Sequence, residues 1–521
     1  MKPPLSLNRR SALGAVAMAA IAPRMASAQM ASAQTPPTAA ATDRSLALDK
    51  MIADLMGRTG VPGMAVAVVH KDTVPYLKGF GVREAGKPGD VDADTTFQLA
   101  SLSKPVATTV VAALVGDKLV TWDDPIILHD SGFAMHEPWV TSQVTLRDMF
   151  CHRSGLPDHA GDTLEDIGFD RAAVLRRLRY QKPASSFRSH YAYTNFGFTA
   201  AAVSAAMASG MDWEALSAKR LYDRLGMANT SSRFADFAGS ANHAHGHVRQ
   251  DGAWVAKYVR DADAQSPAGG ASSSASDMAR WLRLQLGRGS VDGTQIVAAD
   301  ALDETHRPQI VGAPPADPTV DHAGFYGLGW NVSYDERGRV SWGHSGAFAL
   351  GAGTCVNILP GEDLAVVALT NASPVALAEA VCRSALDIML TGATQRDWLA
   401  LFGPLMEKAM APTYGTKTDH AKPPANPLPA LPSAAYVGGY QSPLFGTARI
   451  DATPAGLSLA LGPKQGNFPL VHYDRDVFLY QPVGENAASP SAVIFTLGAD
   501  QKATAVRIEN LDVDGQGDFT R

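Results

Sequence analysis

The stretch FQLASLSKPVATTVVAALVGDK, residues 97–118, carries the local pattern that decides the fold of this chain. It predicts a helix from Ser101 to about Val115, because Ala, Val and Leu recur after a proline that only a first helical turn tolerates. Ser101 and Lys104 lie three residues apart at its start, so their side chains project from one side. A lysine whose pKa is lowered by burial can accept the proton of a serine hydroxyl. Ser103 is the rival nucleophile, but it would point away from Lys104, and we expect it to pack locally.

The overall composition is that of an ordinary globular protein, with 46% hydrophobic and 18% charged residues in 521. The formal net charge is −6 without any block of clustered Lys and Arg, so we expect no nucleic-acid partner. No apolar run after the N-terminal region approaches the roughly 20 residues of a membrane span. Cys151, Cys355 and Cys382 are too few and too scattered for a disulfide framework or a metal cage, and we expect them to be buried.

Residues 1–34 have the features of an export signal. Arg9 and Arg10 precede a mildly apolar run, and Ala-Ser-Ala triplets at 26–28 and 31–33 suit a signal peptidase. The paired arginines and weak hydrophobicity are typical of a twin-arginine signal, with a general secretory signal as the alternative. We therefore expect a protein that is exported, either to the periplasm or out of the cell.

Residues 43–400 combine strand signals at both ends with helix signals in between. Apolar runs at Met64–Val69 and Val74–Val82 predict a hairpin, and further strand-length runs recur near the end of the unit. Ser373 followed by Pro374 predicts a helix start after the last of these runs. The pattern predicts a sheet assembled from both ends of the unit, with helices inserted between.

The remainder of the chain divides into a linker and a small second unit. Residues 401–433 form the predicted linker, because most of this stretch is rich in Pro, Thr, Lys and Ala. Residues 434–521 contain short β-type runs at intervals that suit an antiparallel barrel or sandwich. We therefore expect an all-β C-terminal domain.

Two motifs downstream of Lys104 complete a candidate site. Tyr193-Thr194-Asn195 is the only Tyr-x-Asn in the chain, and His344-Ser345-Gly346 follows it. With Ser-x-x-Lys, these resemble the ordered Ser-x-x-Lys, Tyr-x-Asn and Lys/His-x-Gly motifs of the serine penicillin-recognising enzymes, which include class C β-lactamases and D,D-peptidases. The resemblance covers about residues 46–392. It implies an α+β fold, in which helices flank an antiparallel sheet and form a helical subdomain.

The same resemblance implies a role for each matching residue. Ser101 would attack a carbonyl carbon to form an acyl-enzyme, while Lys104 and Tyr193 shuttle its proton to the leaving group. Asn195 would hold the substrate's amide. The backbone N–H groups of Ser101 and Ala347 would form an oxyanion hole. No metal or other cofactor is implied.

The third motif, with His344 and Gly346, bears on the substrate. His344 stands where many β-lactamases have lysine, and it would bond Tyr193 or the acidic end of a substrate and change charge near neutral pH. His-x-Gly resembles the peptidase side of the family, so we expect a penicillin-binding hydrolase of small peptides or amides of the D-amino-acid type. A carboxylesterase and a class C-like β-lactamase are alternatives, and a non-catalytic penicillin-binding or sensing module is a third. The oligomeric state stays open.

Two other patterns compete with this interpretation. Residues 343–347 nearly match the Gly-x-Ser-x-Gly elbow of α/β-hydrolases, but Ala347 replaces the last glycine and the predicted context is strand-to-strand. His243, His245 and His247 alternate, which on a strand would align three imidazoles and suggest zinc. We prefer a loop at the rim of the active site for these histidines.

Overall fold

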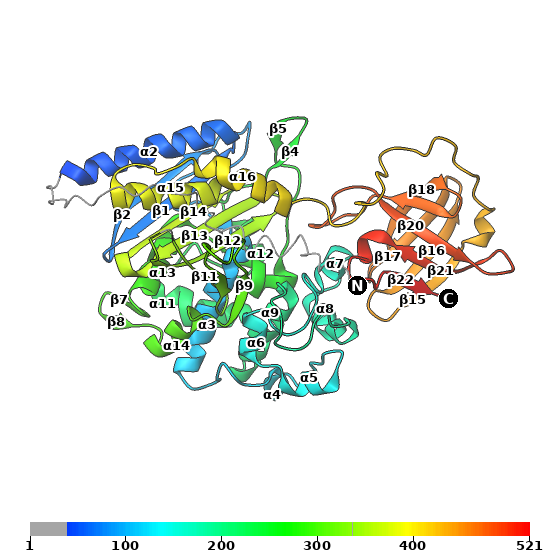
Figure 1. The fold of residues 1–521 in the computed structure, drawn as a ribbon, viewed down its shortest axis with the longest axis horizontal. Coiled ribbons are helices and arrows are strands. Elements are labelled where there is room, and N and C mark those ends of the chain that lie inside the picture. The colour runs from blue at the N-terminus through cyan, green and yellow to red at the C-terminus, as the bar shows by residue number, and fades with distance from the viewer. Residues whose placement is uncertain (1–38, 336) are drawn as a thin grey trace.

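The computed structural model describes residues 39–335 and 337–521, so the expected export signal at 1–34 lies outside the described residues. Figure 1 shows a large unit of helices and sheet, with a smaller unit of strands, coloured orange to red, beside it. Within the described residues, no helix is both long and apolar enough to cross a bilayer.

The large unit is built on a sheet whose strand order is β2-β1-β14-β13-β12-β11-β10-β9. All neighbouring strands pair antiparallel, and Met64 of the first strand lies opposite Thr370 of the last. This pairing confirms that the sheet is assembled from both ends of the unit. The strands are β1 (Gly63–His70), β2 (Thr73–Gly81), β9 (Ile310–Ala313), β10 (Gly324–Tyr326), β11 (Asn331–Tyr334), β12 (Val340–Phe348), β13 (Ala352–Leu359) and β14 (Leu364–Thr370).

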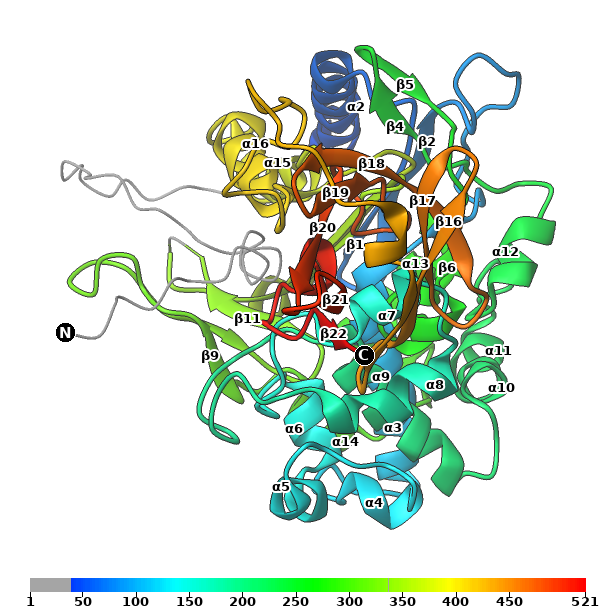
Figure 2. The ribbon, with the colours of Figure 1, turned by 90° about the vertical axis from the view of Figure 1, so that its right-hand side faces the viewer.

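The side chains of β1 point alternately to the two faces of the sheet, and each set packs into a separate hydrophobic core. Met64, Val66 and Val68 pack with the helices α2 (Ala39–Thr59), α15 (Leu377–Thr391) and α16 (Trp398–Ala409). Ala65, Ala67 and Val69 belong to the core on the opposite face. Figures 1 and 2 show α2, α15 and α16 together along one face of the sheet. Burial on both faces explains why this strand is an unbroken apolar run.

The opposite face carries the helical part of the large unit. Its centre is α3, which is buried along most of its length because it lies between the sheet and the remaining helices. A capping box opens α6, where Thr145 and Asp148 satisfy each other's backbone N–H groups. The helices are α3 (Ser103–Gly116), α4 (Ile126–His129), α5 (Pro138–Gln143), α6 (Leu146–Phe150), α7 (Asp162–Asp166), α8 (Arg171–Arg177), α9 (Asn195–Ala208), α10 (Trp213–Ser217), α11 (Asp223–Leu225), α12 (Phe234–Gly239), α13 (Ala275–Leu286) and α14 (Ala299–Thr305).

Three short strand pairs lie outside the main sheet. One of them joins the segment before Ser101 to the segment before α13, and it holds the entry to α3 in place. The pairs are β3 (Phe97–Gln98) with β6 (Ser272–Ser273), β4 (Val248–Gln250) with β5 (Ala253–Val255), and β7 (Ser290–Val291) with β8 (Thr294–Gln295).

The structure corrects two expected boundaries. The helix expected from Ser373-Pro374 begins at Leu377, because the Ser373 hydroxyl bonds the carbonyl oxygens of Ala349 and His247 and caps no helix. At the other end, α16 continues to Ala409, well inside the expected linker at 401–433. The first part of that segment therefore packs on the large unit.

The C-terminal unit is a closed antiparallel barrel of the strands β15 to β22, which agrees with the expected all-β domain. Buried aromatic rings fill it, with Tyr436 against Phe478 and Phe495 at 5.2 and 4.8 Å between centroids. The strands are β15 (Gly438–Ser442), β16 (Gly446–Thr453), β17 (Gly456–Leu461), β18 (Gly466–Asp474), β19 (Val477–Tyr480), β20 (Ser491–Leu497), β21 (Ala503–Ile508) and β22 (Asp518–Thr520).

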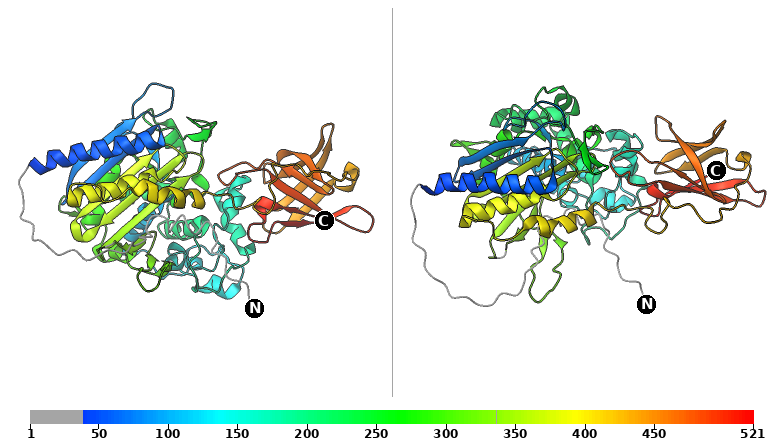
Figure 3. Two further views of the ribbon diagram at one scale, coloured as in Figure 1. Left: turned by 45° about the horizontal axis from the view of Figure 1, so that its top comes forward. Right: turned by 90° about the horizontal axis from the view of Figure 1, so that it is seen from above.

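The barrel rests against the α7–α8 side of the large unit, as both views of Figure 3 show. Arg177 at the end of α8 donates to the carbonyl oxygens of Pro443 and Leu444 at 3.0 and 2.9 Å. Asp166 at the end of α7 accepts the backbone N–H of Glu485 at 2.8 Å. The contacts of Arg177 hold the β15–β16 loop of the barrel against the large unit, and the contact of Asp166 holds the β19–β20 loop.

Candidate active site

Ser101 lies in a single 3-10 turn, Ala100–Leu102, immediately before α3. Ala100 has a φ of 47°, a left-handed conformation that residues other than glycine seldom adopt. Such strain at the residue before a nucleophile is typical of a functional site. The expected α-helix therefore starts two residues later than predicted, at Ser103.

Lys104 is fully buried beneath Ser101, and its Nζ lies 3.2 Å from Ser101 Oγ. Nζ also donates to Asn195 Oδ1 at 2.7 Å and to the Ala268 carbonyl oxygen at 3.0 Å. Burial lowers the pKa of Lys104 well below its ordinary value, and the charge of Asp162 only partly opposes this shift. A neutral amine has two hydrogens, which these two acceptors use, so its lone pair remains for the Ser101 hydroxyl.

Tyr193 forms the second contact of the Ser101 hydroxyl. Its ring lies 4.4 Å from Lys104 Nζ, and its hydroxyl bonds Ser101. Burial raises the pKa of Tyr193 far above its ordinary value, despite the opposing effect of the bond to Ser101. The phenol is therefore protonated at neutral pH and can donate a proton inside the site.

Asn195 bridges the lysine to an acid that the motifs do not contain. Its Oδ1 accepts from Lys104, and its Nδ2 donates to Asp162 Oδ2 at 2.9 Å. The orientation of the amide follows from these partners, because the amine here donates and the carboxylate accepts. His159 Nδ1 bonds the same Asp162 oxygen at 2.7 Å.

His344 lies beside the site but is held by other groups. Its Nδ1 bonds the Ser345 carbonyl oxygen at 2.7 Å, and its Nε2 lies 2.9 Å from the Tyr326 hydroxyl. Burial lowers the pKa of His344 to about 3. The expected change of its charge near neutral pH is therefore wrong, because the buried ring is neutral. His344 was expected to bond Tyr193 or the acidic end of a substrate. Its ring centroid lies 6.3 Å from that of Tyr193, and its Nε2 bonds Tyr326.

Gly346 allows β12 to approach the turn that contains Ser101 closely. A Cβ at this position would collide with the Leu99 carbonyl oxygen and with Thr354 Oγ1. The absent side chain places the adjacent residue, Ala347, in the wall of the same cavity as Ser101. This proximity is what an oxyanion hole formed by their two N–H groups requires.

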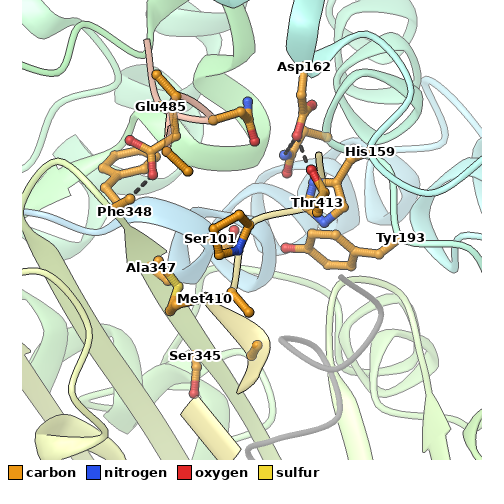
Figure 4. A pocket seen from close by; sticks show the side chains of 18 of the residues that line it. Ser101, His159, Asp162, Tyr193, Ser345, Ala347, Phe348, Met410, Thr413 and Glu485 are labelled. Carbon is orange, nitrogen blue, oxygen red and sulfur yellow. Dashed lines mark hydrogen bonds and ion pairs between the residues drawn. The ribbon is translucent and has the colours of Figure 1, made fainter. Parts of the chain in front are cut away.

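Most of the side chains described above line one cavity of about 220 Å³. Figure 4 shows Ser101 at its centre, with Tyr193 and His159 on one side and Phe348 and Glu485 on the other. Lys104 and Gly346 are not among the residues that line the cavity. The lining residues that motif analysis predicted are Ser101, Tyr193, Asn195, His344 and Ala347; those that it missed include His159, Asp162, Gln265, Phe348, Met410 and Glu485.

The β19–β20 loop of the barrel forms part of this cavity, with Glu485 and the three residues that follow it. Asp166 accepts from the N–H of Glu485 and from the N–H and Nδ2 of Asn486, at 2.8, 3.2 and 2.7 Å. The Glu485 carboxylate accepts the N–H of Ala349 and lies 3.7 Å from Arg260 Nε. The C-terminal domain therefore contacts the active site, which no local sequence signal indicates.

The large unit matches a protein-family model. Residues 48–386 match the model described as Beta-lactamase. The chain belongs to the β-lactamase family. Residues 422–520 match a model described as a domain of unknown function, DUF3471, which covers the barrel. The β-lactamase-family region coincides with the sheet and helices that carry Ser101, Lys104, Tyr193 and His344.

Curated relatives of this β-lactamase-family chain include hydrolases and a penicillin-binding protein. An unguisins hydrolase (ungD') of Aspergillus campestris is 26% identical over 488 residues, 88% of each chain. Penicillin-binding protein 4 of Amycolatopsis lactamdurans is 26% identical over 321 residues, 60% of this chain and 81% of the relative. The octameric penicillin-binding protein homologue of Pyrococcus abyssi shares the fold, with a TM-score of 0.57, 18% identity, and coverage of 89% of this chain and 97% of the other.

The residues that suggested other kinds of site have different roles in this β-lactamase-family fold. The segment 343–347 lies inside strand β12, so it forms no strand-to-helix elbow. Ser103 Oγ accepts the N–H of Ala271 at 3.0 Å and packs locally, as expected. All three cysteines are free and buried, as expected.

The alternating histidines bind separate partners. His243 Nδ1 bonds the Ser240 carbonyl oxygen, and His247 uses Nδ1 for the Asn371 carbonyl oxygen and Nε2 for the Ala85 N–H. Among the described residues, no group of His, Cys, Asp and Glu could hold a metal ion. None of the three histidines is among the residues that line the cavity of Ser101.

Proposed function

We propose that this protein is a serine hydrolase that forms an acyl-enzyme on Ser101 and cleaves peptide or amide bonds of the D-amino-acid type. The observation that carries the proposal is the buried Lys104 amine, 3.2 Å from Ser101 Oγ and bonded to two acceptors. A base held in this way can take the serine proton as the oxygen attacks a carbonyl carbon.

The remaining groups supply the other steps. The N–H groups of Ser101 and Ala347 stabilise the negative oxygen of the tetrahedral intermediate, where one such donor contributes about 10²–10³ in rate. The proton passes from Lys104 to Tyr193, whose phenol protonates the departing amine. Water then attacks the ester of Ser101, and the same groups act in reverse to release the acid.

The substrate class rests on the third motif and on similar proteins. His-x-Gly resembles the peptidase side of the family. One relative over most of the chain is named a hydrolase of unguisins, and another a penicillin-binding protein. Acyl transfer to a serine is a chemistry that fits both a hydrolase and a protein that binds penicillin covalently. We therefore include covalent binding of penicillin in the proposal.

The barrel loop supports a limit on substrate size. Glu485 and Asn486 close one side of the cavity, and Asp166 anchors them. We propose that this loop restricts the site to small substrates. Asp166→Ala should raise the ratio of kcat/KM for long peptides to kcat/KM for dipeptides. An unchanged ratio, with the loop shown to be released by hydrogen exchange, contradicts the restriction.

Covalent labelling tests the nucleophile. Wild-type protein should form an adduct with fluorescent penicillin and hydrolyse D-amino-acid amides and p-nitrophenyl esters. Ser101→Ala should do neither, while Ser103→Ala, as the matched control, should retain both. Full hydrolysis by Ser101→Ala would overturn the assignment.

The same assay separates the alternatives. Turnover of esters without amides would identify a carboxylesterase, and rapid turnover of penicillin a β-lactamase. A stable adduct without turnover of any substrate would identify a binding or sensing module.

We also propose that the protein is exported. The paired Arg9 and Arg10 and the small-residue triplets at 26–28 and 31–33 support a cleaved twin-arginine signal. Cell fractionation should find the mature chain outside the cytoplasm. Replacement of both arginines by lysine should retain it inside. Unchanged export of that variant would favour the general secretory route, and a full-length cytoplasmic wild type would refute export.

A further inference from the structure

His159 is a side chain of the cavity that the proposed chemistry leaves unused. Its Nδ1 lies 2.7 Å from Asp162 Oδ2, and its backbone N–H donates to the Tyr193 carbonyl oxygen at 2.7 Å. A carboxylate oxygen only accepts hydrogen bonds, so Nδ1 carries the hydrogen in this pair. In the neutral imidazole, the other ring nitrogen, Nε2, presents a lone pair.

The position of this lone pair is set by two independent contacts. Asp162 fixes the ring from one side, and the ring centroid of Tyr193 lies 5.5 Å away on the other. Both His159 and Asp162 line the cavity that contains Ser101, and Figure 4 shows His159 between Asp162 and Tyr193. The acceptor is therefore held rigidly beside the reacting groups.

His159 Nε2 is buried and has no hydrogen-bond partner among the residues that the structure describes. A buried polar atom without a partner costs free energy, and ligands commonly supply the missing bond at such positions. The partner that fits a lone pair is an N–H or O–H donor.

Asn195 is less available to bind the substrate's amide than its motif implies. Its Oδ1 already accepts from Lys104, and its Nδ2 already donates to Asp162. It mainly connects the catalytic lysine to the Asp162–His159 pair. Two acceptors on this side of the cavity lack a partner among the described residues, Asp162 Oδ1 and His159 Nε2. The imidazole lies two hydrogen bonds away from Asn195 through Asp162.

We propose that His159 Nε2 accepts a hydrogen bond from an N–H of the substrate, next to the scissile carbonyl on its acyl side. The donor is an amide or an ammonium group. This inference rests on the proposed function and deepens it, because it selects acyl groups that carry nitrogen. His159 is then a specificity-determining residue, oriented by Asp162.

Matched substrates test the proposal directly. For the amide donor, p-nitrophenyl N-acetyl-D-alaninate is compared with the 2-acetoxypropanoate ester, in which oxygen replaces N–H. For the ammonium donor, D-alanine p-nitroanilide is compared with isobutyryl p-nitroanilide, in which a methyl group replaces the ammonium. The wild type should prefer at least one N–H substrate by about tenfold in kcat/KM. The pair that shows the preference identifies the donor.

Two variants distinguish the role of Nε2 as a hydrogen-bond acceptor from the structural role of the bond between His159 and Asp162. His159→Asn keeps an N–H for Asp162 but removes the acceptor, so the preference should fall to near unity, with the oxygen or methyl analogue little affected. His159→Gln places an amide oxygen near the position of Nε2 and should restore part of the preference. His190→Asn, at an exposed position, is the matched control and should behave as the wild type.

The possible failures are distinguishable. A wild type without preference for either N–H substrate overturns the inference, and so does a His159→Asn variant that slows both members of a pair equally. Either result leaves the proposed function intact if the penicillin adduct still depends on Ser101. If that dependence is lost, the proposed function itself fails.

Discussion

The Tyr326 hydroxyl lies 2.9 Å from His344 Nε2, and this bond decides what the third motif can do. Because His344 Nδ1 faces the Ser345 carbonyl oxygen, Nε2 is the acceptor and the tyrosine donates. The imidazole is therefore neutral and fixed, with its pKa lowered to about 3 by burial. It supports the strand that carries Gly346 and Ala347, and it offers no positive charge to a substrate at neutral pH.

Tyr326→Phe should destabilise the protein by about 1–3 kcal/mol, because it leaves Nε2 buried without a donor. Thermal or urea unfolding measures this loss, and kcat/KM should also fall as β12 loses its support. Tyr334→Phe, at a partly exposed position of the next strand, should change neither quantity. Equal stability of the two variants would contradict the role of the bond.

Lys104→Arg should reduce the rate of acylation by about 10²–10⁴-fold, because arginine stays protonated and cannot accept the Ser101 proton. Burial lowers the pKa of Lys104, so its neutral form persists as pH falls below 10.5. The acid limb of the kcat/KM profile should therefore lie far below that pH in the wild type. Stopped-flow penicillin labelling measures the rate, with Lys50→Arg on the surface as control. Normal labelling of Lys104→Arg would exclude the lysine as base.

Gly346→Ala should separate β12 from the turn of Ser101, because its Cβ would meet Leu99 and Thr354. Loss of one oxyanion donor then lowers kcat by about 10²–10³-fold. Gly361→Ala is the matched control, since a Cβ there meets nothing within 4 Å. Full activity of a folded Gly346→Ala protein would show that the close approach is not required.

Docking of the barrel loop should weaken as pH rises. Burial raises the pKa of Glu485 to about 8 and that of Asp166 to about 6, and both carboxyls lie beside Glu165 and Arg260. Both carboxyls bind protons more tightly when docked, so docking is strongest below about pH 4 and declines until Glu485 ionises near pH 8.

Hydrogen exchange of residues 484–488 at pH 5 and pH 8.5 measures this effect, and exchange should be faster at the higher pH after correction for the intrinsic rate. Glu485→Gln cannot ionise and should reduce the difference. Glu137→Gln, an exposed change, should preserve it. Equal protection at both pH values would refute the expected dependence.

Local patterns predicted much of the fold. The hairpin of β1 and β2 and the short strands of the barrel depend on neighbours in sequence, and both were found where expected. Ser373 failed as a helix start because carbonyl groups from distant segments take its hydroxyl. Tertiary contacts override local propensity at such positions.

In the candidate site too, residues marked by local motifs could be predicted, whereas residues that act through tertiary contacts could not. Ser101, Tyr193 and Ala347 could be placed in one cavity because ordered motifs mark them. Asp162 and Glu485 could not, because each acts through a partner far away in the chain and has no spacing that marks it. His344 was located correctly, but its charge depends on the Tyr326 hydroxyl and on burial, which a motif does not contain.

The bond between Asp166 and Glu485 joins residues 319 positions apart. Since chains are made and folded from the N-terminus, the segment with Ser101 and Lys104 emerges from the ribosome long before the loop that closes its cavity. The last wall of the cavity is added only when residues 438–520 have been made and have folded into the barrel. The cavity is therefore completed long after Ser101 and Lys104 have left the ribosome, and a chain terminated before the barrel would present an open, less selective Ser101.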